Sequence, residues 1–291
     1  MPTYNSEAWL EQSVRSVLEQ SFENLELIIS DNASEDGTEQ LCRELAARDP
    51  RIRYLRKPRN IGVANNYNAV LHEASGVYFK WASSNDLCDP GLIAQCVAVL
   101  DAEPNCVLCH SRTRLILGES GKMEDYQEDL NLRQKRPVER FTAFLDRLQL
   151  NNAMNGVMRT AAIRRTGLCR NYLSGDVIMM GELALLGEFV QLPDFLFYRR
   201  MDERTATPLM PTDVVRRYYD PAGRSKMPFI RWRTSSAFVT APWRLNLRIR
   251  EAVPVTLYAL RRAVWARREL MLELRQVVLG ARPGQRNVGG P

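Results

Sequence analysis

The chain has 291 residues, of which 45% are hydrophobic and 25% are charged. These values are typical of a globular protein with one large domain or two small ones. No run of 18 apolar residues exists, which excludes a membrane-spanning helix, and the first residues lack the pattern of a signal peptide. Cys106 and Cys109 lie in a predicted strand, and a chain this long needs no disulfide framework. We therefore expect six reduced cysteines and a cytoplasmic protein.

Positive charge is concentrated toward the end of the chain. The net charge is +6, but residues 224–286 hold 14 arginines and lysines against three glutamates, a local charge of +11 that leaves −5 for the remainder. One interpretation is a solvated, arginine-rich helical surface. The other is attraction to an anionic membrane surface or another polyanionic partner. Few aromatic residues are interleaved with these arginines, so we expect no nucleic acid as a partner.

Predicted helices and strands alternate over the first 110 residues. The first helix covers residues 7–20, where apolar side chains recur at i, i+3 and i+4 spacing. The elements that follow are strand 25–30, helix 36–48, strand 52–55, helix 64–75, strand 77–82, helix 90–101 and strand 105–110. This alternation favours an α/β fold with a mostly parallel, doubly wound sheet.

The rest of the chain has a less regular pattern. Residues 118–137 are polar and contain two glycines, which predicts a mobile loop. The elements expected next are helix 138–149, a strand near 155–159, helix 160–166, an apolar helix 177–186, an irregular segment 202–226, an amphipathic stripe from Val255 to Leu279 and a disordered tail at 280–291. The stripe would pack against the main domain or a partner helix. The predicted units are a domain at 1–205 and a basic, mainly helical extension at 206–279.

Two predicted strands each end in a short loop with carboxylate and amide side chains. The first loop runs from Asp31 to Asp36, and the second contains Asn85 and Asp86. In an open α/β sheet, ligands bind outside the carboxyl ends of the strands. Such side chains suit a hydroxylated ligand, or a divalent cation that bridges the protein to a phosphate. The motifs of dinucleotide, P-loop, zinc-protease and serine-hydrolase sites are absent, and we interpret the two histidines as structural.

An ordered set of short motifs runs through the first 200 residues. It comprises Met1-Pro-Thr-Tyr-Asn5, Gln20-Ser-Phe22, the loop from Asp31 to Thr38, Asn60-Ile-Gly62, Asn85-Asp86, Val157-Met-Arg-Thr160, Asp176 with Glu182, and Leu196-Phe-Tyr-Arg-Arg200. This set resembles the family 2 glycosyltransferases, whose nucleotide-sugar-binding domain has the GT-A fold. The resemblance implies a GT-A domain followed here by a basic helical C-terminal extension.

The resemblance also implies a nucleotide-sugar site. The residues that it places around the nucleotide base are Pro2, Tyr4, Asp31 and Asn32. An aromatic face can cover a pyrimidine ring while a carboxylate accepts its N–H. Asn60 and Gly62 match a turn that lets the backbone approach the nucleotide. The alternative for these two residues is a plain helix-entry turn.

The metal-binding motif of the family corresponds to Asn85-Asp86. Asp86 matches the carboxylate that holds Mg²⁺ or Mn²⁺ on the diphosphate, and Asn85 replaces a second Asp. One carboxylate is compatible with Mg²⁺ because phosphates and waters complete its shell. The loss of the neighbouring charge should weaken affinity for the cation. Asn85 retains the donors and acceptors needed to contact ribose hydroxyls.

The position of Asp176 matches the catalytic base. Inverting transfer needs a carboxylate that takes the proton of the acceptor hydroxyl. The alternative is that Asp176 caps the following helix with its side chain. Glu182, on the same apolar helix, is either a buried orienting group or a partnered core charge.

Two further features concern the ends of the matched region. Arg199 and Arg200 end a predicted strand and either clamp phosphate or acceptor or face solvent. Relatives often carry a histidine shortly after this pair, whereas this chain has Asp202, whose carboxylate would repel a diphosphate. The family has a strand directly ahead of its Pro-x-Tyr-Asn element, and this chain begins at Met1. We therefore expect that the natural start lies upstream.

The predicted function is a metal-dependent, inverting, hexosyltransferase-type activity in polysaccharide biosynthesis. The expected donor is a nucleotide-sugar with UDP as its nucleotide, and the expected acceptor is a hydroxyl of a glycan or of a lipid-linked intermediate. We expect a cytoplasmic enzyme with peripheral contact at the inner face of the cell membrane through its basic helix, and the oligomeric state stays open. Two alternatives are a catalytically impaired nucleotide-binding module and a membrane-surface or assembly protein that acts through that helix.

Overall fold

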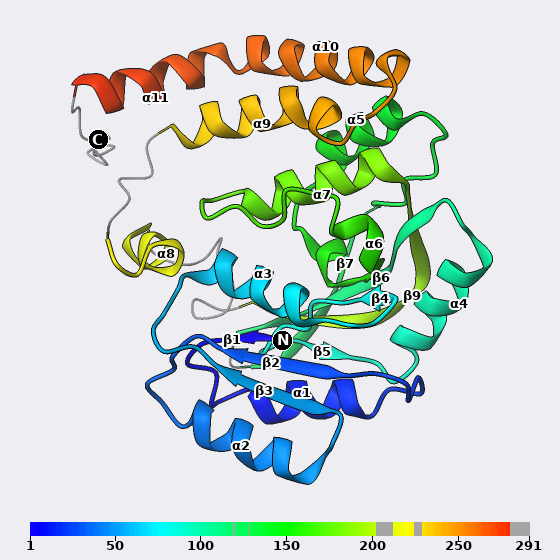
Figure 1. The fold of residues 1–291 in the computed structure, drawn as a ribbon, viewed down its shortest axis with the longest axis vertical. Helices are drawn as coiled ribbons and strands as arrows, with labels where there is room; N and C mark the ends of the chain where they lie inside the picture. The colour runs from blue at the N-terminus through cyan, green and yellow to red at the C-terminus, as the bar shows by residue number, and fades with distance from the viewer. Residues whose placement is uncertain (119, 128, 202–211, 224–228, 280–291) are drawn as a thin grey trace, which may run out of the picture.

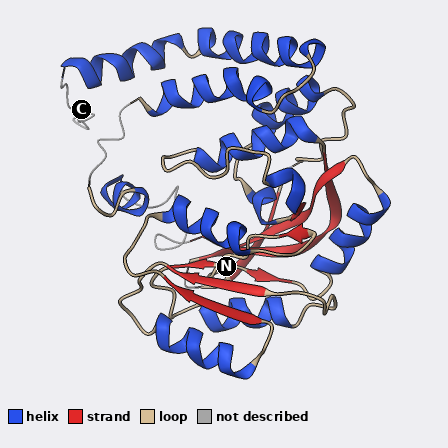
Figure 2. Ribbon diagram, viewed as in Figure 1, coloured by secondary structure: helices blue, strands red, loops and turns tan. Residues whose placement is uncertain are grey.

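The computed structural model describes residues 1–118, 120–127, 129–201, 212–223 and 229–279. Strands occupy the middle of the main body and helices cover them, while three C-terminal helices lie along one end (Figures 1 and 2). Asp202, the expected domain boundary near residue 205 and the expected disordered tail at 280–291 lie outside the described residues.

The N-terminal part is a three-stranded parallel sheet of β1 (Pro2–Thr3), β2 (Leu27–Asp31) and β3 (Ile52–Arg56), in that order. Helices α1 (Leu10–Leu18) and α2 (Thr38–Arg48) lie on one face of this sheet, and α3 (Val63–Glu73) lies on the other (Figure 1). Pro2 and Thr3 pair with Ser30 and Asp31 of β2. Strand β1 therefore lies at the edge of this sheet, next to β2.

The second sheet is mixed. Its strands are β4 (Tyr78–Phe79), β5 (Leu87–Cys88), β6 (Cys106–Leu117), β7 (Lys122–Tyr126), β8 (Val157–Arg159) and β9 (Glu188–Met201). The order is β4-β8-β6-β9-β5, with β7 paired to β6. Only β6 and β9 pair in parallel among these described strands, and the other pairs are antiparallel. The predicted α/β fold is confirmed, with the parallel pairing confined to the first sheet and to β6–β9.

Two segments that the sequence predicts to be irregular contain regular secondary structure. Residues 118–137, predicted as a mobile loop, hold β7, which pairs with β6 from Leu117↔Lys122 to Thr113↔Tyr126. Gly118 and Gly121 have φ of +52° and +64°, so the glycines that suggested a loop form a hairpin turn. Within 202–226, likewise expected to be irregular, residues Thr212–Tyr219 form helix α8.

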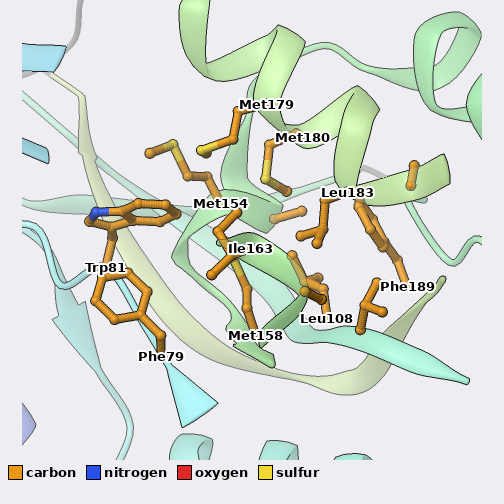
Figure 3. Close-up of a cluster of buried hydrophobic side chains, with 14 of the residues drawn as sticks. Phe79, Trp81, Leu108, Met154, Met158, Ile163, Met179, Met180, Leu183 and Phe189 are labelled. Atoms are coloured by element: carbon orange, nitrogen blue, oxygen red, sulfur yellow. The ribbon is translucent and has the colours of Figure 1, made fainter. Parts of the chain in front are cut away.

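A large buried cluster joins the second sheet to helix α7 (Gly175–Leu186) (Figure 3). Trp81 and Phe79 contact edge-on, with ring centroids 4.8 Å apart, and Met179, Met180 and Leu183 of α7 belong to the same cluster. Helix α7 is apolar around most of its circumference because it is buried between the sheet and other helices. This packing fixes the start of α7 relative to the loop that follows Trp81.

The remaining helices of the main body are α4 (Leu92–Ala102), α5 (Pro137–Arg147), α6 (Thr160–Ile163) and a 3₁₀ turn at Asn152–Asn155. The C-terminal part consists of α9 (Ile230–Arg244), α10 (Ile249–Trp265) and α11 (Arg267–Leu279). The predicted stripe from Val255 to Leu279 is thus divided between two helices, which meet at Ala266.

Helix α9 packs on α7 and helix α10 packs on α5, while α11 contacts α9 (Figure 1). Phe141, Leu185, Ala241, Leu245 and Val255 share one buried cluster, so one side of these helices packs against the main domain. The expectation that the stripe itself packs there is wrong, because Leu257, Leu260, Val264, Met271 and Val278 are exposed. No helix in the described ranges is both long enough and apolar enough to cross a membrane.

Candidate functional site

Two joined cavities open where the strands of the first sheet end. The larger has a volume of about 620 Å³ and the smaller about 160 Å³. Both are lined by Val63, Tyr67, Ser83, Asn85 and Tyr218, so they form one continuous hollow. Its position at the carboxyl ends of parallel strands is where open α/β sheets bind ligands.

The larger cavity is built around a pair of asparagines. The Asn32 side-chain amide donates to Oδ1 of Asn60 at 2.8 Å, and Oδ1 of Asn32 accepts from the backbone N–H of Ile61 at 2.9 Å. Pro2 and Tyr4 continue the wall from β1. The structure thus brings together four of the predicted base-binding and turn residues, although 58 positions separate Pro2 from Asn60.

Gly62 begins helix α3 at this wall with φ of +82° and ψ of 155°. A Cβ at this position would lie 2.5 Å from the backbone oxygen of Tyr219. Only glycine avoids both the strained φ and this contact. The turn at Asn60–Gly62 is therefore also the point where the chain after β9 approaches the first sheet.

Asp31 lies behind the wall, and it does not line either cavity. Its side chain is completely buried and accepts hydrogen bonds from the backbone and hydroxyl of Ser34, from the Tyr54 hydroxyl at 2.9 Å and from Arg56. The Asp31 carboxylate raises the pKa of Tyr54, although burial of the phenol is the larger cause. In this structure Asp31 holds the loop after β2, and its predicted contact with the base would require these bonds to rearrange.

The smaller cavity contains both carboxylates assigned to chemistry, Asp86 and Asp176. Asp86 is buried, and its Oδ1 accepts the backbone N–H of Arg200 at 2.9 Å. Burial raises the pKa of Asp86, while the Arg200 N–H and the charges of Arg199 and Lys80 act in the opposite direction. Asn85 lines both cavities and accepts a hydrogen bond from Ser83.

Asp176 lies in the first turn of α7. The helix begins after Ser174, which has φ of +69°, and no side chain caps it. The structure therefore does not support the capping alternative. Instead, Oδ2 of Asp176 accepts a hydrogen bond from the Asn151 side-chain amide at 2.8 Å. The charge of Asp176 adds to burial in raising the pKa of Tyr218 to about 12, so this phenol stays protonated beside the carboxylate.

The two neighbouring arginines have different surroundings. Arg199 lines the smaller cavity and donates to Oδ1 of Asn152 at 2.7 Å. Arg200 lines neither cavity. Its guanidinium lies 4.1 Å from the ring centroid of Trp9 and donates to Gln12 at 2.9 Å. Only Arg199 is placed to meet a ligand directly.

Glu182 is a partnered core charge. It is fully buried, accepts the backbone N–H of Gly167 at 2.6 Å, and forms ion pairs with Arg170 and with Arg244 of α9. Because Arg170 also lines the smaller cavity, Glu182 links this wall to the C-terminal helices.

Several lining residues have no counterpart in the sequence interpretation. They are Trp9, Tyr67, Asn151, Arg170, Arg217 and Tyr218. Val214 and Tyr218, and likewise Val215 and Tyr219, are spaced i, i+4, which is a helical signal inside the segment expected to be irregular. No comparable signal distinguishes Asn151, because it precedes a short 3₁₀ turn.

A parallel α/β sheet with amide and carboxylate side chains around a hollow at its carboxyl edge is the arrangement in which open α/β proteins bind their ligands. The family model of "Glycosyl transferase family 2" matches residues 1–172. The chain belongs to this family.

Known proteins match mainly the N-terminal part. The chain is 30% identical over 114 residues to an uncharacterized glycosyltransferase of Haemophilus influenzae, which covers 39% of this chain and 35% of that protein. It is 36% identical over 102 residues to the putative glycosyltransferase EpsE of Bacillus subtilis. That match covers 35% of this chain and 37% of EpsE. It is 32% identical over 107 residues to the minor teichoic acid biosynthesis protein GgaB of Bacillus subtilis. That match covers 36% of this chain and 12% of GgaB. The chain spans about a third of the first two relatives.

Solved structures share the fold over nearly the whole chain. S. aureus TarS 1–349 in complex with UDP-GlcNAc has a TM-score of 0.62 at 16% identity, covering 90% of this chain and 70% of that one. Mannosyltransferase PcManGT from Pyrobaculum calidifontis, in complex with GDP-Man and Mn²⁺, has a TM-score of 0.51 at 17% identity. The match covers 97% of this chain and 79% of PcManGT. These likenesses show the GT-A fold.

Proposed function

We propose that this chain transfers a sugar from a UDP-sugar to a hydroxyl of a glycan or lipid-linked acceptor, with inversion at the anomeric carbon. The observation that carries this proposal is the pair Asp86 and Asp176 in the smaller cavity, which opens into a larger cavity walled by Tyr4 and Asn32. The UDP-GlcNAc complex of TarS and the GDP-Man complex of PcManGT support a nucleotide-sugar as the class of ligand.

In this proposal the nucleoside occupies the larger cavity. Tyr4 is partly exposed there and offers an aromatic face, and the Asn32–Asn60 pair offers amide groups. The diphosphate lies where the two cavities join, beside Asn85. Arg217 of α8 lines the larger cavity and adds positive charge to this wall.

Asp86 is the residue proposed to hold Mg²⁺ or Mn²⁺. No group of three or more His, Cys, Asp or Glu side chains forms a metal cluster in the described part of the chain. A buried carboxylate at the cavity wall nevertheless fits a cation whose shell is completed by diphosphate oxygens and water. When bound, such a cation offsets the negative charge that builds on the departing diphosphate. PcManGT was solved with Mn²⁺.

Asp176 is the proposed general base. The acceptor oxygen attacks the anomeric carbon, the bond from that carbon to the diphosphate oxygen breaks, and the hydroxyl proton passes to Asp176. UDP leaves with the bonding electron pair. The hydrogen bond from Asn151 holds the carboxylate in place for this step. Arg199 contributes positive charge on the same wall.

The proposed setting is surface-polymer synthesis on the cytoplasmic side of the membrane. The likeness to GgaB supports a surface polymer as the product class, since GgaB is a minor teichoic acid biosynthesis protein. A lipid-linked acceptor would place the enzyme at the inner face of the membrane.

The proposal is tested by a donor screen followed by a turnover assay. The melting temperature is measured with UDP, UDP-GlcNAc, UDP-glucose and GDP-mannose, each with and without Mn²⁺, because a ligand that binds the folded state raises it by mass action. We expect the UDP compounds to raise it most, and more with Mn²⁺. The preferred donor should then be hydrolysed slowly or transferred. Donor binding without hydrolysis or transfer would favour a nucleotide-binding module.

A further inference from the structure

Helices α10 and α11 carry a continuous apolar stripe on their exposed side, hereafter the outer stripe. On α10 it consists of Ile249, Val253, Leu257, Leu260 and Val264, all exposed. Their spacing is i, i+4, i+8, i+11 and i+15, which keeps them on one face of a helix. On α11 the stripe continues with Met271 and Val278, also exposed.

The outer stripe faces away from the protein. The opposite side of α10 packs against α9 and α5, and it carries the buried residues Ala252, Val255 and Ala259. The N–H of Ala266 bonds to Arg262 and its carbonyl accepts from Leu270, so α11 continues from α10 with little change of direction (Figure 1). Together the two helices extend for about 45 Å at 1.5 Å per residue along one edge of the molecule.

Exposed arginines border the outer stripe along its length. Arg250, Arg261, Arg268 and Arg275 are 11, seven and seven residues apart, which corresponds to three, two and two helical turns. They therefore form a second row on one side of the outer stripe. On its other side lies Trp243 of α9, whose indole N–H donates to Thr256 at 2.9 Å.

The carboxylates of these helices lie elsewhere. Glu251 and Glu269 are 18 residues apart, which is five full turns, and neither occupies a position of the outer stripe or of the arginine row. Glu273 faces inward, where it accepts the backbone N–H groups of Arg231 and Trp232 at the start of α9. The exposed face of α10 and α11 thus combines apolar side chains with positive charge.

We infer that the outer stripe docks on an anionic phospholipid surface. Helices that lie in a membrane interface bury their apolar face at the acyl boundary, while arginines reach the headgroups. The charge complementarity favours this partner over a second copy of the chain, since a two-fold dimer through this face would bring together two surfaces of the same positive charge. This inference concerns a surface distinct from the cavities and does not depend on the proposed transferase activity.

The test is co-sedimentation with vesicles of phosphatidylcholine alone or mixed with phosphatidylglycerol, without any donor or acceptor. We expect the full chain to bind the phosphatidylglycerol vesicles, and added salt to weaken this binding. The variant R261Q/R268Q/R275Q should bind roughly 100-fold more weakly, because each arginine near an anionic surface contributes about fivefold. Its control is R15Q/R43Q/R48Q, which removes three charges from exposed ion pairs of α1 and α2 and should bind like the wild type.

The apolar part is tested by L257S/L260S, with V77S/M123S as a control at two exposed sites elsewhere. We expect only the first variant to lose vesicle binding, and a cooperative thermal unfolding transition without any ligand reports whether each variant is folded. Equal binding of each variant and its control would overturn the inference. So would wild-type binding that salt does not weaken, or an absence of vesicle binding together with a dimer that L257S/L260S dissociates.

Discussion

The side-chain amide of Asn151 donates a hydrogen bond to Oδ2 of Asp176 at 2.8 Å, at the wall of the smaller cavity. Asn151 precedes the 3₁₀ turn and Asp176 opens α7, so the bond joins two elements that the sequence separates by 25 positions. It fixes the orientation of the carboxylate that we propose as the general base.

Replacing Asn151 by Ala should lower kcat by about 10- to 100-fold, since small misplacements of a reacting group have costs of this size. Donor affinity should change little, because the donor contacts lie mainly in the larger cavity. Initial rates at saturating donor and UDP titrations measure the two effects. The control Gln40→Ala lies on the exposed side of α2 and should retain full activity. A loss of UDP affinity without a loss of kcat would contradict this role.

Replacing Asp86 by Asn should remove the gain in UDP affinity that Mn²⁺ provides. In the presence of Mn²⁺, UDP should therefore bind about 10- to 100-fold more weakly. The ligand-free protein should melt at the same or a higher temperature, because burial raises the pKa of Asp86 and the folded state therefore disfavours its charge. Asparagine keeps an acceptor for the Arg200 N–H. Thermal melting measures the stability of the variant, and UDP titration with and without Mn²⁺ measures the metal dependence of its UDP affinity. Undiminished Mn²⁺ dependence would remove Asp86 from the metal role.

Replacing Gly62 by Ala should destabilise the protein by about 1–3 kcal/mol, because alanine is strained at φ of +82° and its Cβ meets the carbonyl of Tyr219. Gly121→Ala is a matched control, since Gly121 has φ of +64° with no atom near the added Cβ. Urea unfolding of both variants separates the backbone strain from the contact with Tyr219. Equal destabilisation would mean that this contact is unimportant.

The pH dependence of stability should contain a contribution from His110. Burial lowers the pKa of this imidazole from 6.5 to about 4. Between these values the unfolded chain binds a proton that the folded protein does not, so stability falls as pH decreases from about 6.5 to 4, by roughly 3 kcal/mol for this group. The free energy of unfolding of wild type and His110→Gln, measured across this range, should show a smaller slope for the variant. Parallel curves would contradict the prediction.

The sequence predicted the elements that carry strong periodicity or turn chemistry. Helix 64–75 and the turn at Asn60–Gly62 appear within a residue or two of their predicted places. Strand β7 was missed because its residues, Lys122–Tyr126, are polar and mostly exposed and show no apolar alternation. Its turn glycines then suggested a loop, although their positive φ values serve a hairpin.

For the site, the ordered motifs indicated which residues would gather but not what each would contact. Asp86 and Asp176, which the motifs assign to metal binding and to catalysis, line the same cavity across 90 positions of sequence. Asp31 was placed beside the base, yet Tyr54 and Arg56 from the next strand engage its carboxylate. Such partners depend on strand register, which short motifs do not specify. Their functional roles stay predictions.

The most direct test of the proposed function is the turnover of Asp176→Asn beside its donor affinity. The variant keeps the size of the side chain and an oxygen that can accept the Asn151 hydrogen bond, but it cannot take the acceptor proton. We expect UDP-sugar affinity close to that of the wild type and a kcat lower by about 10²- to 10⁴-fold. Turnover at the wild-type rate with the same donor and acceptor would contradict the assignment of Asp176 as the base.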